Sequence, residues 1–243
     1  MRFKETLRQI LRKFGFDIVR YHYNVHPLAR RLHLLATHEI NLVFDIGANT
    51  GQYAQQLRTA GFHGRIVSFE PQHAAHTQLQ SLAQNDPLWE VVNIALGEID
   101  GQAELHIAGN SLSSSLLDML PSHVRSDPHS AYVGTESITV RKLDSIFNTY
   151  YRSGEKLYVK IDTQGFEKQV LNGAQKSLDK IVGIQMEMSL VPLYRGETLF
   201  TEMLGMLTQV GFTLMAVEPV FSDPTTGQLL QLDGVFFRTS QSS

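Results

Sequence analysis

Four acidic side chains stand at the ends of short apolar runs along the chain: Asp45, Glu70, Asp162 and Glu187. In an α/β protein such runs are typical of buried parallel strands, whose carboxyl ends meet at one edge of the sheet. Ligands of open α/β sheets bind at that edge. Carboxylates there accept hydrogen bonds from hydroxyl groups, act as general bases or bind divalent cations. The four residues therefore predict a site for a small ligand and for proton transfer.

The first of these runs, residues 42–51, reads LVFDIGANTG and ends in a glycine-rich turn. Gly47 and Gly51 have no Cβ and tolerate positive φ, so the backbone can approach a ligand closely. The turn lacks the G-x-G-x-x-G spacing of the dinucleotide fingerprint and the Lys-Ser/Thr ending of a P-loop. The pattern Asp45-x-Gly47-x-Asn49-x-Gly51 instead resembles motif I of the class I S-adenosylmethionine methyltransferases.

The second run, residues 65–71, reads RIVSFEP and places Glu70 at its end. An acid at the tip of the second strand of such a sheet accepts hydrogen bonds from both hydroxyls of a ribose. An acid-Gly-x-x-x-Gly turn alone is equally typical of an ordinary strand-to-helix connection. Because Glu70 follows at the next strand tip, the two signals together predict a nucleoside site.

The chain has the length and composition of one large α/β domain. It holds 243 residues, of which 42% are apolar and 19% are charged, an ordinary globular balance. The absence of cysteine excludes a disulfide framework, a thiolate metal site and a cysteine nucleophile. No apolar stretch reaches the roughly 18 residues of a membrane span, and the start of the chain lacks the apolar core of a signal peptide. We therefore expect a cytoplasmic protein.

Positive charge is concentrated at the start of the chain. Residues 1–31 hold eight Arg or Lys and two acids, a net charge of +6, whereas the remainder holds 13 basic and 22 acidic residues, a net charge of −9. The acidic remainder argues against a nucleic-acid substrate. Residues 1–14 place apolar side chains on one helical face with basic residues around it, which is typical of peripheral contact with an anionic membrane, here its inner face. The alternative is a helix that packs on the domain or on a partner subunit, and the oligomeric state stays open.

Strands and helices alternate along the rest of the chain. We expect strands at residues 90–96, 103–107, 137–141, 157–162, 182–187, 213–219 and 229–238, and a helix at 166–178. The closing strand-turn-strand is typical of an antiparallel edge on a mostly parallel sheet. Residues 110–128 are rich in Ser and form the longest irregular segment. A loop of this length predicts a lid or a wall of the acceptor site.

Longer motifs resemble the FkbM-type methyltransferase family over residues 42–238. Five stretches carry the resemblance: VFDIGANTGQY, FEP, LDSI after a strand, YVKIDTQGFEKQVLNGA, and a last strand that contains FF. The fourth stretch is the most diagnostic. It departs from the family pattern at Gln164, where Glu is common.

The resemblance implies a class I methyltransferase (Rossmann-like) α/β fold. We expect a mostly parallel seven-stranded sheet with an antiparallel edge strand and with helices on both faces. Residues 1–40 are expected to form a helical extension packed on the core, and residues 41–243 the methyltransferase domain. The implied activity is transfer of a methyl group from S-adenosylmethionine to a hydroxyl of a sugar, a glycan or a secondary metabolite.

The resemblance also assigns the cofactor contacts. Asp45 is expected to hold the methionine amino group, directly or through water, and Glu70 to bind the ribose. Gly47 and Gly51 are expected to let the chain pass close to the cofactor. The other predicted cofactor residues are Asn49, Gln52 and Tyr53 near the turn, and Asn93 and Ala95 at the tip of the third strand, where the adenine is expected.

A hydroxyl is a poor nucleophile, so that a base or a metal must assist it. Asp162 is the first candidate for the base, because the tip of the fourth strand faces the methyl group in this fold; the alternative role for this residue is a helix N-cap. Glu187 is the second candidate, and His123 in the Ser-rich segment is the third. A divalent cation between Asp162 and Glu187 is a further alternative, although no metal is expected.

The sequence is compatible with two other functions. A nicotinamide-dependent oxidoreductase would also use Glu70, but the glycine spacing for its pyrophosphate is missing. A non-catalytic protein with a nucleoside pocket would share the cofactor residues and lack turnover. Titration with S-adenosylhomocysteine and a methyl-transfer assay separate these functions.

Overall fold

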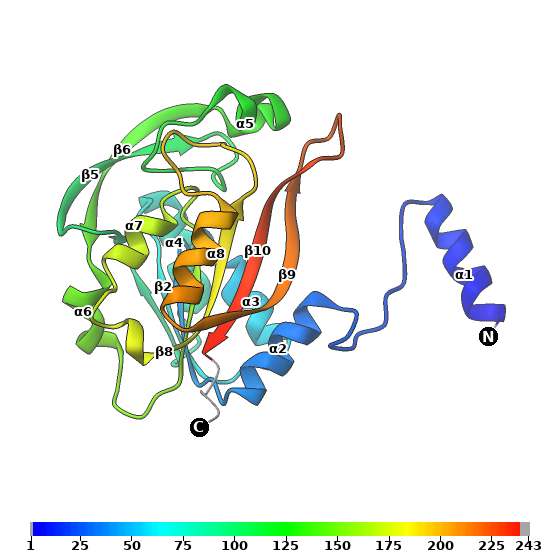
Figure 1. Cartoon of the computed structure of the whole chain (residues 1–243), viewed down its shortest axis with the longest axis horizontal. Coiled ribbons are helices and arrows are strands. Elements are labelled where there is room, and N and C mark those ends of the chain that lie inside the picture. The colour runs from blue at the N-terminus through cyan, green and yellow to red at the C-terminus, as the bar shows by residue number, and fades with distance from the viewer. Residues whose placement is uncertain (1, 239–243) are drawn as a thin grey trace.

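A seven-stranded sheet forms the centre of the computed structural model, which describes residues 2–238, with side chains from residue 5 (Figure 1). In spatial order its strands are β3 (Trp89–Val92), β2 (Arg65–Phe69), β1 (Leu42–Ile46), β7 (Leu157–Ile161), β8 (Ile181–Ser189), β10 (Leu229–Arg238) and β9 (Phe212–Ser222). The first five are parallel, and β10 is antiparallel to both of its neighbours. The predicted mostly parallel sheet with an antiparallel edge is confirmed.

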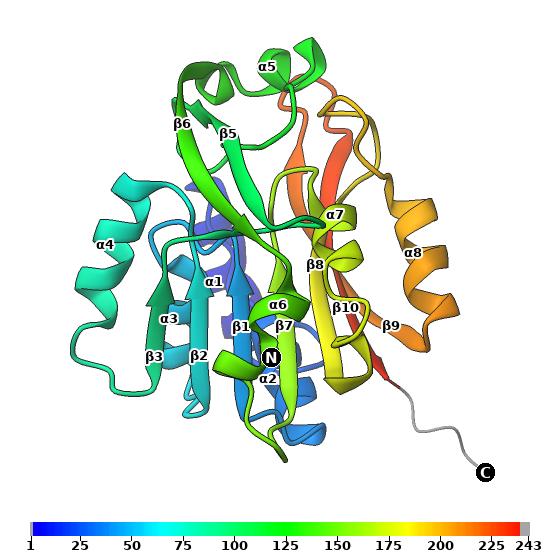
Figure 2. The same cartoon turned by 90° about the vertical axis from the view of Figure 1, so that its left-hand side faces the viewer.

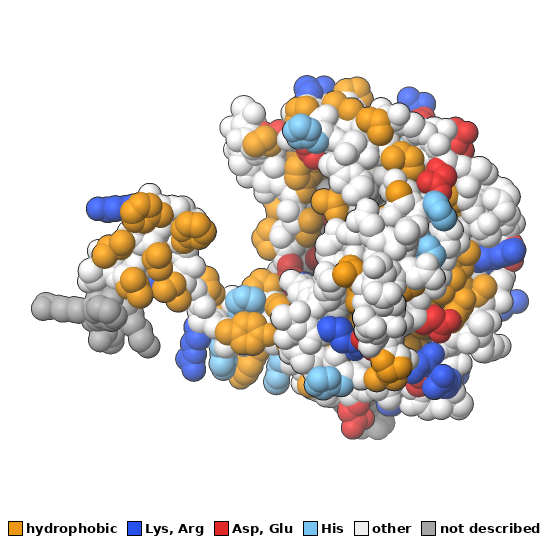
Figure 3. Space-filling view, turned by 180° about the vertical axis from the view of Figure 1, so that it is seen from behind, with side chains coloured by type: hydrophobic (Ala, Val, Ile, Leu, Met, Phe, Trp, Pro, Cys, Tyr) orange, Lys and Arg blue, Asp and Glu red, His pale blue; other side chains and the backbone are white. Residues whose placement is uncertain are grey.

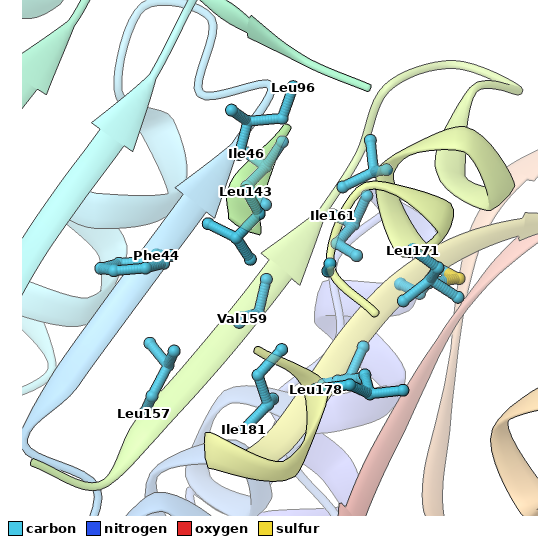
Figure 4. Packing of buried hydrophobic residues seen from close by; sticks show 14 of the residues in the cluster. Phe44, Ile46, Leu96, Leu143, Leu157, Val159, Ile161, Leu171, Leu178 and Ile181 are labelled. Carbon is cyan, nitrogen blue, oxygen red and sulfur yellow. The ribbon is translucent and has the colours of Figure 1, made fainter. Parts of the chain in front are cut away.

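Helices cover both faces of this sheet because side chains alternate along the strands. Phe44 and Ile46 of β1 join Val159 of β7 in one apolar cluster, together with Leu143 and Leu171 from helices (Figure 4). The helices on this face are α6 (Leu143–Tyr150), α7 (Glu167–Asn172) and α8 (Phe200–Gln209). Figure 2 shows these three helices in front of the sheet.

The opposite face packs against three helices from the first half of the chain. Val43 of β1 and Tyr158 of β7 lie in a second apolar cluster with Leu35, Leu57 and Leu79. These leucines come from α2 (Pro27–Thr37), α3 (Gln52–Thr59) and α4 (His73–Ala83), respectively. The arrangement is the Rossmann-like layering that the sequence predicts.

Towards the carboxyl ends of the strands, this second cluster gives way to buried polar side chains. Asp45 of β1 lies beside Lys160 of β7, and Lys160 lies beside Gln185 of β8. All three side chains are buried. Buried polar and charged groups are costly unless they are paired or serve a ligand, so this row marks the functional edge of the sheet.

A small three-stranded sheet stands above that edge (Figure 2). Its strands are β4 (Ala95–Leu96), β6 (Tyr132–Arg141) and β5 (Gly101–Ala108), in that order. The strand predicted at residues 90–96 is therefore divided between two sheets. The division falls at Asn93, whose side-chain amide donates to the carbonyl oxygens of Glu70 and Pro71 at 2.9 Å and turns the chain away from β2.

Two other predicted segments differ from the structure. The helix expected at residues 166–178 ends at Asn172, because Gly173 lies against the backbone of Gly97; a Cβ on Gly173 would stand 1.9 Å from the Gly97 oxygen. A short 3₁₀ turn, Leu178–Lys180, follows. The irregular segment 110–128 contains the short helix α5 (Pro121–Ser126).

Of the predicted N-terminal extension, α2 packs on the core, whereas α1 (Arg2–Lys13) is set apart from the domain (Figure 1). The connecting residues fold back on α1 instead: the Asp17 carboxylate accepts hydrogen bonds from Arg8 and Arg12 at 2.9 Å. Phe14 and Phe16 are exposed. No helix within residues 2–238 is long and apolar enough to cross a membrane.

Candidate active site

The turn after β1 is shaped by a close approach to β7. Gly47 has a φ of +75°, and a Cβ on it would stand 1.9 Å from the carbonyl oxygen of Asp162. Gly51 has a φ of +93°, and its Cβ would meet Leu79 of α4 at 2.7 Å. Only glycine fits both positions, so the spacing of the two glycines follows from packing at the sheet edge.

Glu70 fastens this turn from the tip of β2. One carboxylate oxygen accepts the backbone N–H of Asn49 at 2.7 Å, and the other accepts that of Gln72 at 2.8 Å. Burial raises the pKa of Glu70 to about 7, against the opposing effect of these two hydrogen bonds. The carboxylate keeps further lone pairs for the hydroxyl groups of a ligand.

A first cavity opens beside Glu70, between the main sheet and the small sheet. Its lining comes from the tips of β1, β2 and β7, from residues 94–96, from Leu105 of β5 and from Phe166. Five of the predicted site residues line it: Gly47, Asn49, Glu70, Ala95 and Asp162.

The Ser-rich segment forms one wall of the first cavity, through residues 111–116. It is tied down at two points: the Asn49 side-chain amide donates to the backbone carbonyl oxygen of Ser111 at 3.1 Å, and the Ser115 hydroxyl donates to the backbone carbonyl oxygen of Gln164 at 2.7 Å. Asn49, Ser111 and Gln164 all adopt positive φ, an unfavourable conformation for these residue types that is concentrated at functional sites. The position of the segment agrees with the predicted wall.

A second cavity adjoins the first on the side of α2 and α3. Gly47, Asn49, Leu112 and Asp162 line both cavities. The residues that line the second cavity but not the first include the predicted Gln52 and Tyr53, and also Arg31, Lys160, Gln185 and Asp233. The predicted residues of the turn are therefore divided between two adjoining hollows.

Lys160 supplies a fixed positive charge at the floor of the second cavity. Its ammonium lies 3.5 Å from the Asp45 carboxylate and 3.2 Å from the Asp162 carboxylate. Burial alone would lower the pKa of Lys160, but Asp162 and Asp45 outweigh it and hold this pKa above its ordinary value. Lys160 therefore stays charged.

Asp162 is held in place by the same contacts. One carboxylate oxygen faces Lys160, and the other accepts a hydrogen bond from the Gln164 amide at 2.8 Å. The same amide nitrogen donates to the Glu187 carboxylate at 2.6 Å, and the Tyr194 hydroxyl donates to the side-chain Oε1 of Gln164 at 2.7 Å. An amide at position 164 donates to two carboxylates at once, which the Glu common in the FkbM pattern does not do when ionised.

Several predicted site residues line neither cavity. The Asp45 carboxylate is fully buried against Lys160, and the Asn93 amide is used by the chain itself. Gly51 packs against α4. Contact of these three residues with a cofactor stays a prediction.

Two of the three catalytic candidates also lie away from the cavities. Glu187 is buried, accepts hydrogen bonds from Gln164 and Gln231, and has a pKa that burial and the nearby Asp162 charge raise well above its ordinary value. His123 is buried against the rings of Tyr194 and Phe221, and burial lowers its pKa. The geometry therefore gives a direct catalytic role to neither residue.

A metal ion between Asp162 and Glu187 would need further ligands from nearby side chains. Within residues 2–238 no group of three or more His, Asp or Glu side chains is placed to bind a metal ion. Asp162 and Glu187 instead share the Gln164 amide as a hydrogen-bond donor.

Comparison with known proteins assigns the chain to a family. The model of the FkbM methyltransferase domain matches residues 45–214. The chain belongs to the FkbM methyltransferase family. It is thus an S-adenosylmethionine-dependent methyltransferase, as the sequence motifs predict.

Several solved structures are similar to this FkbM methyltransferase at low sequence identity. A methyltransferase candidate from Thermobifida fusca is 13% identical, with a TM-score of 0.50 over 88% of this chain and 79% of that chain. An rRNA methylase from Streptococcus thermophilus is 11% identical, with a TM-score of 0.47 over 92% of this chain and 100% of that chain. No curated protein matches the chain.

The first cavity of this FkbM methyltransferase fits S-adenosylmethionine. Glu70 would accept the ribose hydroxyls, and the apolar side chains of Ile94, Leu105 and Phe166 would contact the adenine. The missing Cβ of Gly47 lets the turn after β1 pack directly against the backbone of Asp162, and both residues line the cavity where the methionine part would lie. These residues would hold the cofactor by hydrogen bonds at one end and apolar contact at the other.

Sequence reasoning missed several residues of the site. Asp233 stands in the last apolar run, LLQLDGVFF, and so carries the same signal as the four acids that were recognised. Lys160 had a weaker signal, as a lone cation within a buried strand. Arg31 and Leu105 had no local sequence signal, because their positions depend on how α2 and the small sheet pack onto the edge of the main sheet.

Proposed function

We propose that this methyltransferase methylates a hydroxyl group of a sugar, a glycan or a secondary metabolite, with Asp162 as the general base. The observation that carries the proposal is the position of Asp162. Among the residues that the structure describes, it is the only carboxylate that lines both cavities. A base at this junction reaches a hydroxyl in the second cavity while the cofactor occupies the first.

The surroundings of Asp162 leave its carboxylate accessible and hold it in place. Its side chain is 32% exposed, whereas that of Lys160 is 9% exposed, so Asp162 is the group that a ligand can reach. The Lys160 ammonium lies 3.2 Å from its carboxylate. The Gln164 amide fixes its orientation.

The proposed reaction uses few groups of the chain. S-adenosylmethionine, when bound, would supply the methyl group of its sulfonium, whose S–CH₃ bond breaks, and would leave as S-adenosylhomocysteine. Asp162 takes the proton of the acceptor hydroxyl as the oxygen becomes methylated, and releases this proton to water afterwards. A base of this kind contributes a factor of roughly 100 to 10,000 to the rate.

The first experiment identifies an acceptor. Extracts of glycans and small metabolites are incubated with the enzyme and S-adenosylmethionine, and mass spectrometry looks for species that gain the mass of one CH₂. Asp162→Asn is then compared with wild type on the acceptor found. We expect kcat to fall at least about 100-fold while S-adenosylhomocysteine affinity changes less than about threefold. Glu187→Gln and His123→Ala serve as the competing variants, and loss of turnover in one of these, but not in Asp162→Asn, would move the base elsewhere.

We also propose that the N-terminal segment contacts an anionic membrane surface. Residues 1–31 carry a net charge of +6. The segment leaves Ile10, Phe14 and Phe16 exposed. Apolar side chains beside basic ones are the combination that binds the interface of an anionic bilayer.

A further inference from the structure

A groove lies between the N-terminal connection and the outer side of α3. Tyr21 and Leu28 form one side of it, and Gln55, Thr59 and Ala60 form the other. The surface of the groove is mostly apolar. It lies outside the two cavities described above and has no part in the proposed proton transfer.

The groove adjoins the second cavity. Gln52 and Gln56 line both of them. The second cavity shares Asp162 and three other residues with the cofactor cavity. The first cavity, the second cavity and the groove therefore adjoin one another in this order. Asp162 lies where the first two meet, and the groove lies at the surface beside α3.

Both cations of the second cavity are paired with carboxylates, and Asp233 adds a further carboxylate to its lining. Arg31 is paired with Glu218, and Lys160 with Asp162. The buried Nε of Arg31 has no hydrogen-bond partner among the described residues. Amide side chains of Gln52, Gln56 and Gln185 add donors and acceptors without charge. A neutral ring with several hydroxyl groups matches such a lining better than a phosphate or a carboxylate does, because no cation is left without a counter-charge.

Exposed apolar side chains precede the groove-lining residue Tyr21 along the chain. Tyr21 lines the groove, and the residues before it leave Phe14, Phe16, Ile18 and Val19 exposed. Figure 3 shows hydrophobic side chains gathered over this N-terminal segment. An apolar chain that leaves the groove would therefore stay in contact with apolar side chains.

We propose that the acceptor is an amphipathic glycoside, with its sugar ring in the second cavity and its apolar aglycone in the groove beside α3. The inference rests on the proposed function, since it places the methylated hydroxyl next to Asp162. It also gives the N-terminal segment a role in catalysis. The segment would present a lipid-linked sugar at the membrane surface to the groove.

Paired glycosides test this inference. Binding of octyl β-D-glucopyranoside, galactopyranoside and rhamnopyranoside, below their micelle concentrations, is compared with that of the corresponding methyl glycosides. The full chain with S-adenosylhomocysteine is titrated by calorimetry. Each buried CH₂ strengthens binding about fourfold, so burial of two or three gives a preference of at least about tenfold for the octyl form. Equal affinities within each pair, or no binding of any octyl glycoside, would overturn the proposal.

Two variants locate the apolar chain. Thr59→Glu places a charge in the groove and is expected to weaken octyl-glycoside binding at least about fivefold without a change for the methyl glycoside. Thr77→Glu, at an exposed threonine of α4, is the matched control and should leave both affinities unchanged. Tyr21→Ser tests the other side of the groove with no added charge. An octyl preference that survives both Thr59→Glu and Tyr21→Ser would overturn the proposal.

The outcomes separate this inference from the proposed function. Methylation of methyl and octyl glycosides with equal efficiency would support hydroxyl methylation and contradict the groove. A groove-dependent octyl preference without methylation of any glycoside would support the groove and contradict the hydroxyl acceptor.

Discussion

The buried carboxylate of Glu70 makes cofactor binding depend on pH near neutrality. Its pKa is raised to about 7 by burial, and both of its oxygens accept backbone N–H groups of the loops that line the cofactor cavity. Ribose hydroxyls donate hydrogen bonds, so they bind the ionised form. We predict that S-adenosylhomocysteine binds more weakly as the pH falls and Glu70 takes up a proton.

The size of the effect follows from the pKa. With a pKa of about 7, Glu70 is roughly nine-tenths ionised at pH 8 and one-tenth ionised at pH 6. The affinity should therefore fall about tenfold between these pH values, or about 1.4 kcal/mol. Calorimetric titrations at pH 6, 7 and 8 measure it.

Two variants test whether the pH dependence of the affinity comes from the Glu70 carboxylate. Glu70→Gln removes the titration and should give a weaker affinity that is nearly constant from pH 6 to 8. Asp233→Asn removes another buried acid, whose pKa burial raises to about 6, and should keep the dependence. A wild-type affinity that does not change with pH, or a dependence that persists in Glu70→Gln, would refute the assignment of Glu70 to the ribose.

Folding stability should change in the same pH range. The folded-state pKa of Glu70, about 7, lies above its ordinary value of 4.5, so the folded protein binds more protons than the unfolded chain between these values. The contribution of Glu70 to the free energy of unfolding therefore falls as the pH rises from about 4.5 to 7. Urea unfolding of wild type and Glu70→Gln at pH 5 and 8 should show a smaller decrease in the variant.

Three further predictions concern the turn, the buried ion pair and the N-terminal segment. Gly47→Ala places a Cβ against the carbonyl oxygen of Asp162 and should weaken S-adenosylhomocysteine binding at least about tenfold. Gly61→Ala is the control, because Gly61 has a φ of +95° but lies in open space, so that this variant carries only the backbone strain of about 1–3 kcal/mol. It should bind S-adenosylhomocysteine normally in the same titration. Arg31→Met leaves Glu218 buried without its partner and should lower the free energy of unfolding by about 3–5 kcal/mol in urea, with recovery in the double variant Arg31→Met/Glu218→Gln. Deletion of residues 1–14 should abolish flotation with anionic liposomes while methyl transfer to a short-chain acceptor persists; equal flotation of both forms would contradict membrane contact.

The strand tips were predictable from the sequence because their signals are local. A buried run followed by an acid or a glycine turn places Gly47, Glu70 and Asp162 at one edge without knowledge of any distant contact. The structure brings these three residues to one cavity, as expected.

The rest of the site depends on long-range pairing. β10 inserts between β8 and β9, and this register sets Asp233 opposite Glu187 and brings it to the second cavity. Similarly, α2 reaches the cavity because Arg31 pairs with Glu218 of β9, far away along the chain. His123 looked available because its loop is polar, but it is enclosed by aromatic rings that no local pattern reveals.

The destination of the methyl group tests the central claim most directly. S-adenosylmethionine with a ¹³C-labelled methyl group is incubated with the enzyme and its acceptor, and the product is examined by NMR. We predict that the label appears as an O-methyl group on a sugar or metabolite hydroxyl, and that Asp162→Asn forms this product at least about 100-fold more slowly. Label on nitrogen or carbon, or an undiminished rate in Asp162→Asn, would contradict the account.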